Sequence, residues 1–161
     1  MNDKRRPIEE RIAALLGRTA YRDIRDGVGG SRIELTDQDV AAQLGYIQRT
    51  YGAPVVQAME TYYGSTLMHE RELRHAWERY CQDVESLDYG TSVLARMSCA
   101  LAIRQFAGHE YTTSSMAEYA WIIKVRRQTL KAATLVVESW LDELWSTGLH
   151  QLRNAFRAIA A

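Results

Sequence analysis

Apolar residues recur at spacings of three and four along most of the chain, and no segment alternates apolar and polar residues with a period of two. Spacings of three and four place side chains on one face of a helix, whereas alternation is typical of a strand. The pattern therefore predicts an all-α fold with several helices in a single domain. The predicted helices cover residues 8–16, 37–51, 55–63, 67–87, 92–107, 116–123 and 127–145, and a terminal helix follows at 149–158.

Residues 18–35 lack this periodicity and contain three glycines among alternating arginines and aspartates. We therefore expect residues 1–35 to form an N-terminal helix and a flexible connector, and residues 36–161 to form the helical domain. Thr36 is placed to cap the first helix of that domain, and Gly52 to end it.

The chain has 20 basic and 20 acidic residues, so its formal net charge is zero, and 47 % of its residues are hydrophobic. Neutrality argues against a protein that coats nucleic acid without sequence preference, but it allows one basic face. No apolar run reaches the roughly 18 residues that a membrane span needs, and the N-terminus does not resemble a signal peptide. We expect no membrane partner and a cytoplasmic location.

Residues 116–137 fit the pattern of a helix-turn-helix, which places its second helix in the major groove of DNA. Such a unit needs a small residue where its two helices touch, and Ala120 occupies that position. Ile123 and Val125 then fall inward before and in the turn, and Leu130 and Ala133 fall inward on the second helix. Lys124 stands where a glycine is usual in the turn.

The residues left exposed by this register carry side chains that bind phosphates or base edges. They contain no acid, which is a local departure from the neutrality of the chain. The predicted DNA-binding residues are Lys124, Arg126, Arg127, Gln128, Thr129 and Lys131. An ordinary amphipathic helix of a bundle has the same spacing, so a solvated basic face is the alternative interpretation.

Residues 36–51 imitate a first helix and glycine turn even better, with Gly45 in the turn position. That register would place Pro54 inside the second helix, where proline costs about 3 kcal/mol. We therefore interpret residues 36–51 as one structural helix.

No pattern of residues indicates catalysis or a bound cofactor. Glu72 and His75 have the spacing of a di-iron ligand pair, but a second Glu-x-x-His is absent, so we predict exposed polar residues and no metal site. Cys81 and Cys99 are too far apart in sequence for a CxxC pair, and we expect both to be reduced thiols.

Two further blocks, Leu35-Thr-Asp-Gln-Asp-Val-Ala-Ala42 and Glu60-Thr-Tyr-Tyr-Gly-Ser65, resemble phage late-gene antitermination proteins of the Q type. The zinc-binding cysteines of some members are missing here. The resemblance implies a DNA-binding transcription regulator that acts on RNA polymerase at a late promoter and lets it read through terminators. Double-stranded DNA and RNA polymerase are then the expected partners.

Two alternatives stay open. A small terminase subunit that recognises viral DNA would also be helical, and it would form a homo-oligomeric ring. The other is a helical protein-protein interaction module without nucleic-acid binding, in which Trp140 and Trp145 would anchor the interface.

Overall fold

The structure is a computed structural model, and it describes residues 37–83, 93–109 and 113–160. These residues hold no strand, and the all-α prediction is confirmed. The helices are α2 (Asp37–Tyr51), α3 (Ala53–Gly64), α4 (Glu70–Asp83), α5 (Val93–Phe106), α6 (Thr113–Ile122) and α7 (Arg127–Ala160). The predicted helix 8–16 and connector 18–35 lie outside the described residues.

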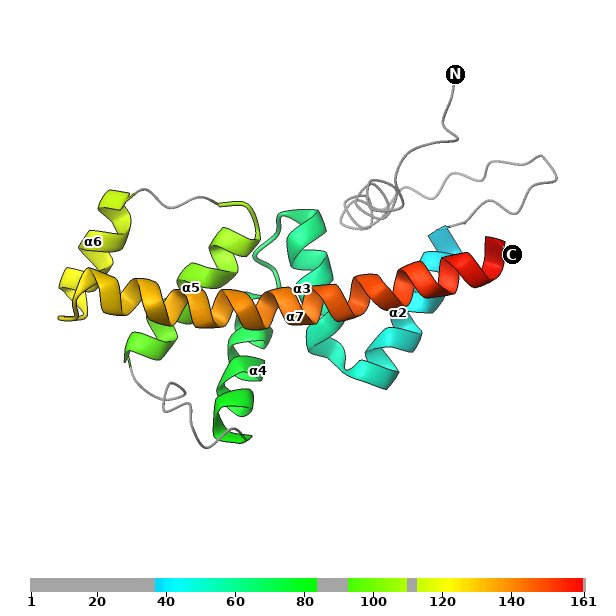
Figure 1. Ribbon diagram of the computed structural model, residues 1–161, viewed down its shortest axis with the longest axis horizontal. Coiled ribbons are helices and arrows are strands. Elements are labelled where there is room, and N and C mark those ends of the chain that lie inside the picture. Colours follow the sequence, from blue (N-terminus) through cyan, green and yellow to red (C-terminus); the bar gives the residue numbers. More distant parts are fainter. Residues whose placement is uncertain (1–36, 84–92, 110–112, 161) are drawn as a thin grey trace, which may run out of the picture.

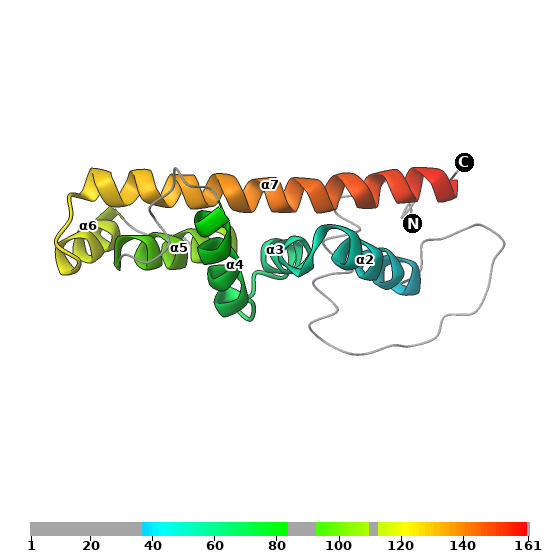
Figure 2. The same ribbon diagram turned by 90° about the horizontal axis from the view of Figure 1, so that it is seen from below.

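Helix α7 runs the full length of the described molecule, and α2 to α6 all pack against one side of it (Figures 1 and 2). At 34 residues it is about 50 Å long. In Figure 2 the shorter helices follow one another beneath α7, so the fold has two layers, one of which is a single helix.

Three apolar clusters form the core, and α7 contributes to each of them. From its N-terminal end, Leu130 joins α5 and α6, then Trp140 and Leu141 join α3, α4 and α5. Leu149 and Leu152 join α2 and α3 nearest the C-terminus. Because all three clusters share this helix, none of the shorter helices is an independent unit.

Helix α2 spans the predicted residues 37–51, and Gly45 lies inside it without a turn. The interpretation of residues 36–51 as one helix is therefore confirmed for the described part. Gly52 follows with a φ of 101°, and Pro54 opens α3 in its first turn. Helix α4 is shorter than predicted, because it begins at Glu70, and residues 84–87 lie outside the described part of the chain.

The predicted break between helices 127–145 and 149–158 is wrong, because α7 continues through Gly148 without interruption. Gly148 is buried, and its φ is not positive. A Cβ built on Gly148 would lie 2.2 Å from the Met59 sulfur and 3.0 Å from a Val55 methyl. The glycine therefore serves close packing of α7 on α3, and it does not end the helix.

We predict opposite effects for alanine at the two helical glycines. Gly148→Ala should lower the free energy of unfolding by about 1–3 kcal/mol, because Met59 and Val55 are buried and cannot move aside freely. Gly45→Ala should raise it by about 0.5–1 kcal/mol, since no atom lies within 4 Å of the added Cβ and alanine favours helix. Urea unfolding of both variants measures the two changes. Equal effects at both positions would contradict the packing role of Gly148.

Candidate nucleic-acid interface

Helix α6 ends in a tight turn that leads into α7. The Lys124 amide donates to the Trp121 carbonyl at 3.1 Å, and the Val125 amide donates to the Ala120 carbonyl at 3.0 Å. Lys124 is left-handed with a φ of 58°. This pair of bonds around a left-handed residue is a Schellman motif, which satisfies carbonyls at a helix end. Lys124 therefore occupies the backbone conformation that a glycine adopts most easily, at the position where the sequence pattern expected one.

The contact between α6 and α7 is made by the small and apolar residues that the spacing predicted. Ala120 is 2 % exposed and Leu130 is fully buried, and both pack against Leu101 of α5. Ile123 and Val125 are partly buried against the same cluster. The direction in which α7 begins is thus fixed by core contacts before its first residue, at Ile123 and Val125, and in its first turn, at Leu130.

All six predicted DNA-binding residues are exposed, and they lie in the turn and the first turn and a half of α7. They are Lys124, Arg126, Arg127, Gln128, Thr129 and Lys131. Within the described residues, none of the four basic side chains forms an ion pair. Residues 113–137 contain these four bases and one acid, Glu118, which gives a local charge of 4 − 1 = +3.

The basic character ends about two turns beyond Lys131, where Glu138, Asp142 and Glu143 follow along α7. Burial raises the pKa of the Glu138 carboxyl, and the neighbouring Asp142 raises it further. The start and the middle of α7 therefore present different electrostatic surfaces. The face of α7 turned away from the shorter helices is free of described elements along its length (Figure 2).

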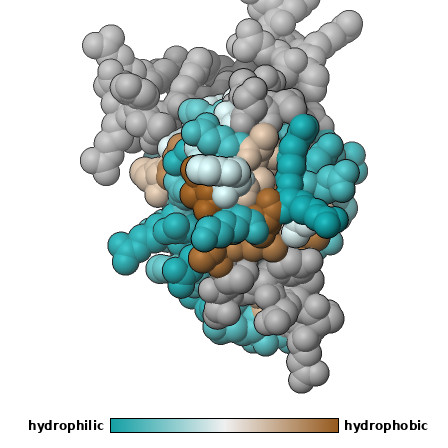
Figure 3. Space-filling view, turned by 90° about the vertical axis from the view of Figure 1, so that its left-hand side faces the viewer, coloured by the Kyte–Doolittle hydropathy of each residue, from teal (hydrophilic) through white to brown (hydrophobic). Residues whose placement is uncertain are grey.

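The same end of the molecule carries exposed apolar side chains that the sequence pattern did not single out. Trp121 is 80 % exposed and Ile122 is 53 % exposed, both at the end of α6. Figure 3 faces this end and shows hydrophobic atoms in the middle with hydrophilic residues on either side. Their exposure could have been predicted from the sequence, because Trp121 and Ile122 lie outside the inward positions set by Ala120 and Ile123.

The aromatic residues of the second resemblance block pack on α7. The Tyr62 ring lies 4.7 Å from that of Trp145 and 5.3 Å from that of Phe106, measured between centroids. Gly64 ends α3, and Ser65 follows in a left-handed conformation. These tyrosines help to hold α3 against α7, so packing is their main role in the described structure.

Trp140 and Trp145, which the interaction-module alternative would use as anchors, belong to the interior. Trp140 is 8 % exposed and lies 5.3 Å from the Trp77 ring. Trp145 is partly buried, and its ring packs on that of Tyr62. Trp121 is a better candidate for a surface anchor than either of them.

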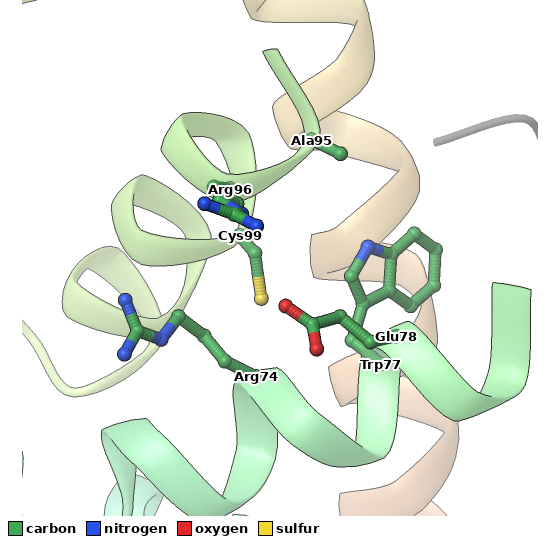
Figure 4. Close-up of a pocket in the computed structure, with 6 residues that line it drawn as sticks. All are labelled: Arg74, Trp77, Glu78, Ala95, Arg96 and Cys99. Carbon is green, nitrogen blue, oxygen red and sulfur yellow. The ribbon is translucent and has the colours of Figure 1, made fainter. Parts of the chain in front are cut away.

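Two hollows lie beside α4, away from the basic end. The smaller, of about 10 Å³, lies between α4 and α5 and is lined by Arg74, Trp77, Glu78, Ala95, Arg96 and Cys99 (Figure 4). It has room for one water molecule and for no larger ligand. The other is an open groove of about 360 Å³ between α4 and α7, with Trp77, Tyr80 and Trp140 among its walls.

Glu72 and His75 are both exposed on α4, as expected from their sequence context. In the described ranges, no group of three or more potential ligands is placed to hold a metal ion. None of the described helices is long and apolar enough to cross a membrane. Comparisons with protein-family models, with curated proteins and with solved structures found no match to this chain.

Both cysteines are buried free thiols. Burial raises the pKa of the Cys99 thiol to about 12. Burial also raises the pKa of Cys81, and the Glu78 carboxylate adds to this effect. We therefore predict that neither thiol reacts appreciably with Ellman's reagent in the native protein near pH 8, because the thiolate is the reactive form. Both should react fully in denaturant, and rapid labelling of Cys99 in the native state would contradict its burial.

Proposed function

We propose that this protein is a sequence-specific DNA-binding transcription regulator, and that the first turns of α7 read the major groove. The observation that carries the proposal is the group of four exposed basic residues around the start of α7. Gln128 and Thr129 are exposed in the same segment. Arginine binds guanine through two hydrogen bonds and glutamine binds adenine in the same way, while lysine and threonine mainly contact phosphates.

The charge at this helix start opposes helix stability. The N-terminus of a helix carries a partial positive charge, so acidic residues stabilise it and basic residues do not. Helix α7 has no acid in its first turn and begins with Arg127, directly after Arg126. The partial charge of the helix and the arginines therefore act together on an anion, and the phosphate backbone of DNA is an anion of suitable geometry.

The acidic residues farther along α7 favour a short DNA contact. Glu138, Asp142 and Glu143 would face phosphates unfavourably if a duplex lay along the whole of α7. A duplex that crosses only the N-terminal turns avoids these carboxylates. Because only a few lysine and arginine side chains would contact phosphates, we expect weak binding to DNA alone and a modest salt dependence.

A weak contact with DNA is effective when a second contact acts in the same complex, because linked contacts gain from effective concentration. The resemblance to Q-type antitermination proteins suggests RNA polymerase as the holder of that second contact. We therefore propose that the protein binds RNA polymerase at a promoter and enables it to transcribe past terminators.

The first test of this function measures DNA binding. Arg127→Ala and Gln128→Ala should relax base preference, each at a cost of about 1–3 kcal/mol where a base contact is lost. Lys131→Ala should weaken binding to all sequences alike and flatten the salt dependence by about one unit of slope. A DNA-selection experiment on the purified protein supplies the site for these titrations.

A matched control removes the same charge elsewhere. Arg49, Arg71 and Arg79 are exposed on α2 and α4, away from the basic end. Their triple alanine variant should retain binding, whereas the Arg126/Arg127/Lys131 triple alanine variant should lose it. If the two triple variants bind duplex DNA equally well, α7 is not the reading helix.

The second test measures transcription in vitro across a terminator placed downstream of the cognate promoter. We expect the wild-type protein to increase readthrough and the Arg126/Arg127/Lys131 triple variant to leave termination unchanged, because it cannot engage the template. Unchanged termination with saturating wild-type protein would exclude antitermination while leaving DNA binding intact.

A further inference from the structure

Three large apolar side chains are exposed around the start of α5 and the end of α6, and the DNA-reading function does not use them. Val93 is 62 % exposed, Trp121 is 80 % exposed and Ile122 is 53 % exposed. Leu94, the neighbour of Val93, packs against the same core cluster as Ala120 of α6. We call Trp121 and Ile122, which are adjacent at the end of α6, the apolar patch, and Figure 3 faces the end of the molecule that carries it.

The patch faces a different direction from the reading residues. Successive residues of a helix are 100° apart, so Glu118 and Ile122 each lie about 200° from Ala120 around α6. Ala120 shares a core cluster with Leu101 of α5 and Leu130 of α7, and the exposed Glu118 and Ile122 therefore point away from that cluster. A duplex on the outer face of α7 leaves Glu118 and Ile122 free, and Lys124 lies at the border between the two surfaces.

One acidic residue, Glu118, and one basic residue, Lys124, flank the apolar patch. Glu118 precedes Trp121 by three residues and Ile122 by four, which makes all three neighbours on the helix surface. Lys124 follows Ile122 by two residues, in the turn. Both charged side chains are exposed, and neither forms an ion pair within the described part of the chain.

We propose that this surface is a two-fold interface with a second copy of the same chain. In a two-fold interface, each residue of a contacting pair occurs on both sides, so the surface must complement itself. A patch with an apolar centre, an acid on one side and a base on the other meets this requirement. Trp121 and Ile122 of the two copies pack together, and Glu118 of each copy pairs with Lys124 of the other, so that in the dimer Lys124 is withheld from DNA phosphates while Arg126, Arg127 and Lys131 stay available.

A partner of a single charge sign fits the surface less well, because it would pair with either Glu118 or Lys124 and repel the other. Together with Val93, the exposed side chains of the patch supply on the order of 350 Å² per copy, below the roughly 800 Å² that each partner of a standard interface buries. The dimer is therefore a weak one, and monomer and dimer exchange with protein concentration.

The experiment is sedimentation equilibrium of the full chain without DNA, over concentrations from nanomolar to hundreds of micromolar. We expect a monomer–dimer equilibrium with a dissociation constant in the micromolar range. Trp121→Ala should raise that constant at least tenfold, since a central aromatic anchor is lost. Met68→Ser is the matched control, because Met68 is 69 % exposed outside the patch and its loss should leave the constant unchanged.

Charge reversal tests the pairing itself. Glu118→Lys and Lys124→Glu should each weaken the dimer several-fold, and the double variant should recover most of the wild-type association. Circular dichroism checks that every variant folds, which the exposure of the changed residues favours. A protein that stays monomeric over the whole range, or a dimer unaffected by Trp121→Ala, overturns the proposal. Because no DNA is present, either result leaves the DNA-binding function untouched.

Discussion

The burial of one face of a single 34-residue helix holds the described structure together. Helix α7 provides side chains to all three core clusters, and the shorter helices bury their apolar faces largely against it. An isolated short helix is marginal in water and gains its stability from such packing. A disturbance of α7 therefore reaches every cluster, including the one under the α6–α7 turn that fixes where Arg126 and Arg127 stand.

The same constraint explains Gly148. Glycine costs about 1 kcal/mol relative to alanine inside a helix. That cost is offset because α3 approaches α7 so closely that a side chain at this position would meet Met59 and Val55. Thr147, beside it, donates its hydroxyl to the Glu143 carbonyl at 2.8 Å, which is compatible with an unbroken helix. The Thr147-Gly148 pair therefore does not interrupt α7.

Gly148 also shows how far the sequence predicts the fold. Helix α2 and the inward positions Ala120, Leu130 and Ala133 follow from local spacing, which the chain itself encodes, while the predicted cap Thr36 lies outside the described residues. A glycine that ends a helix and a glycine that admits a neighbouring helix look alike locally. The difference depends on the position of α3, which is a tertiary fact. The exposure of Trp121 is of the same kind, because tryptophan is usually packed in a core.

The candidate site is the place where local stability rules and the observed sequence disagree. A left-handed lysine in the turn and two arginines at a helix N-terminus are each less favourable than a glycine and an acid would be. Gly108, with a φ of 83°, ends α5 in the same type of motif as Lys124 ends α6, whereas Ser65 after α3 is left-handed without being a glycine. The start of α7 combines a left-handed lysine with two exposed arginines, and such a combination of unfavourable choices is typical of a surface kept for binding. An anion bound between Lys124 and Lys131 would turn each of these unfavourable charges into a favourable contact, so the cost to the free protein becomes affinity in the complex.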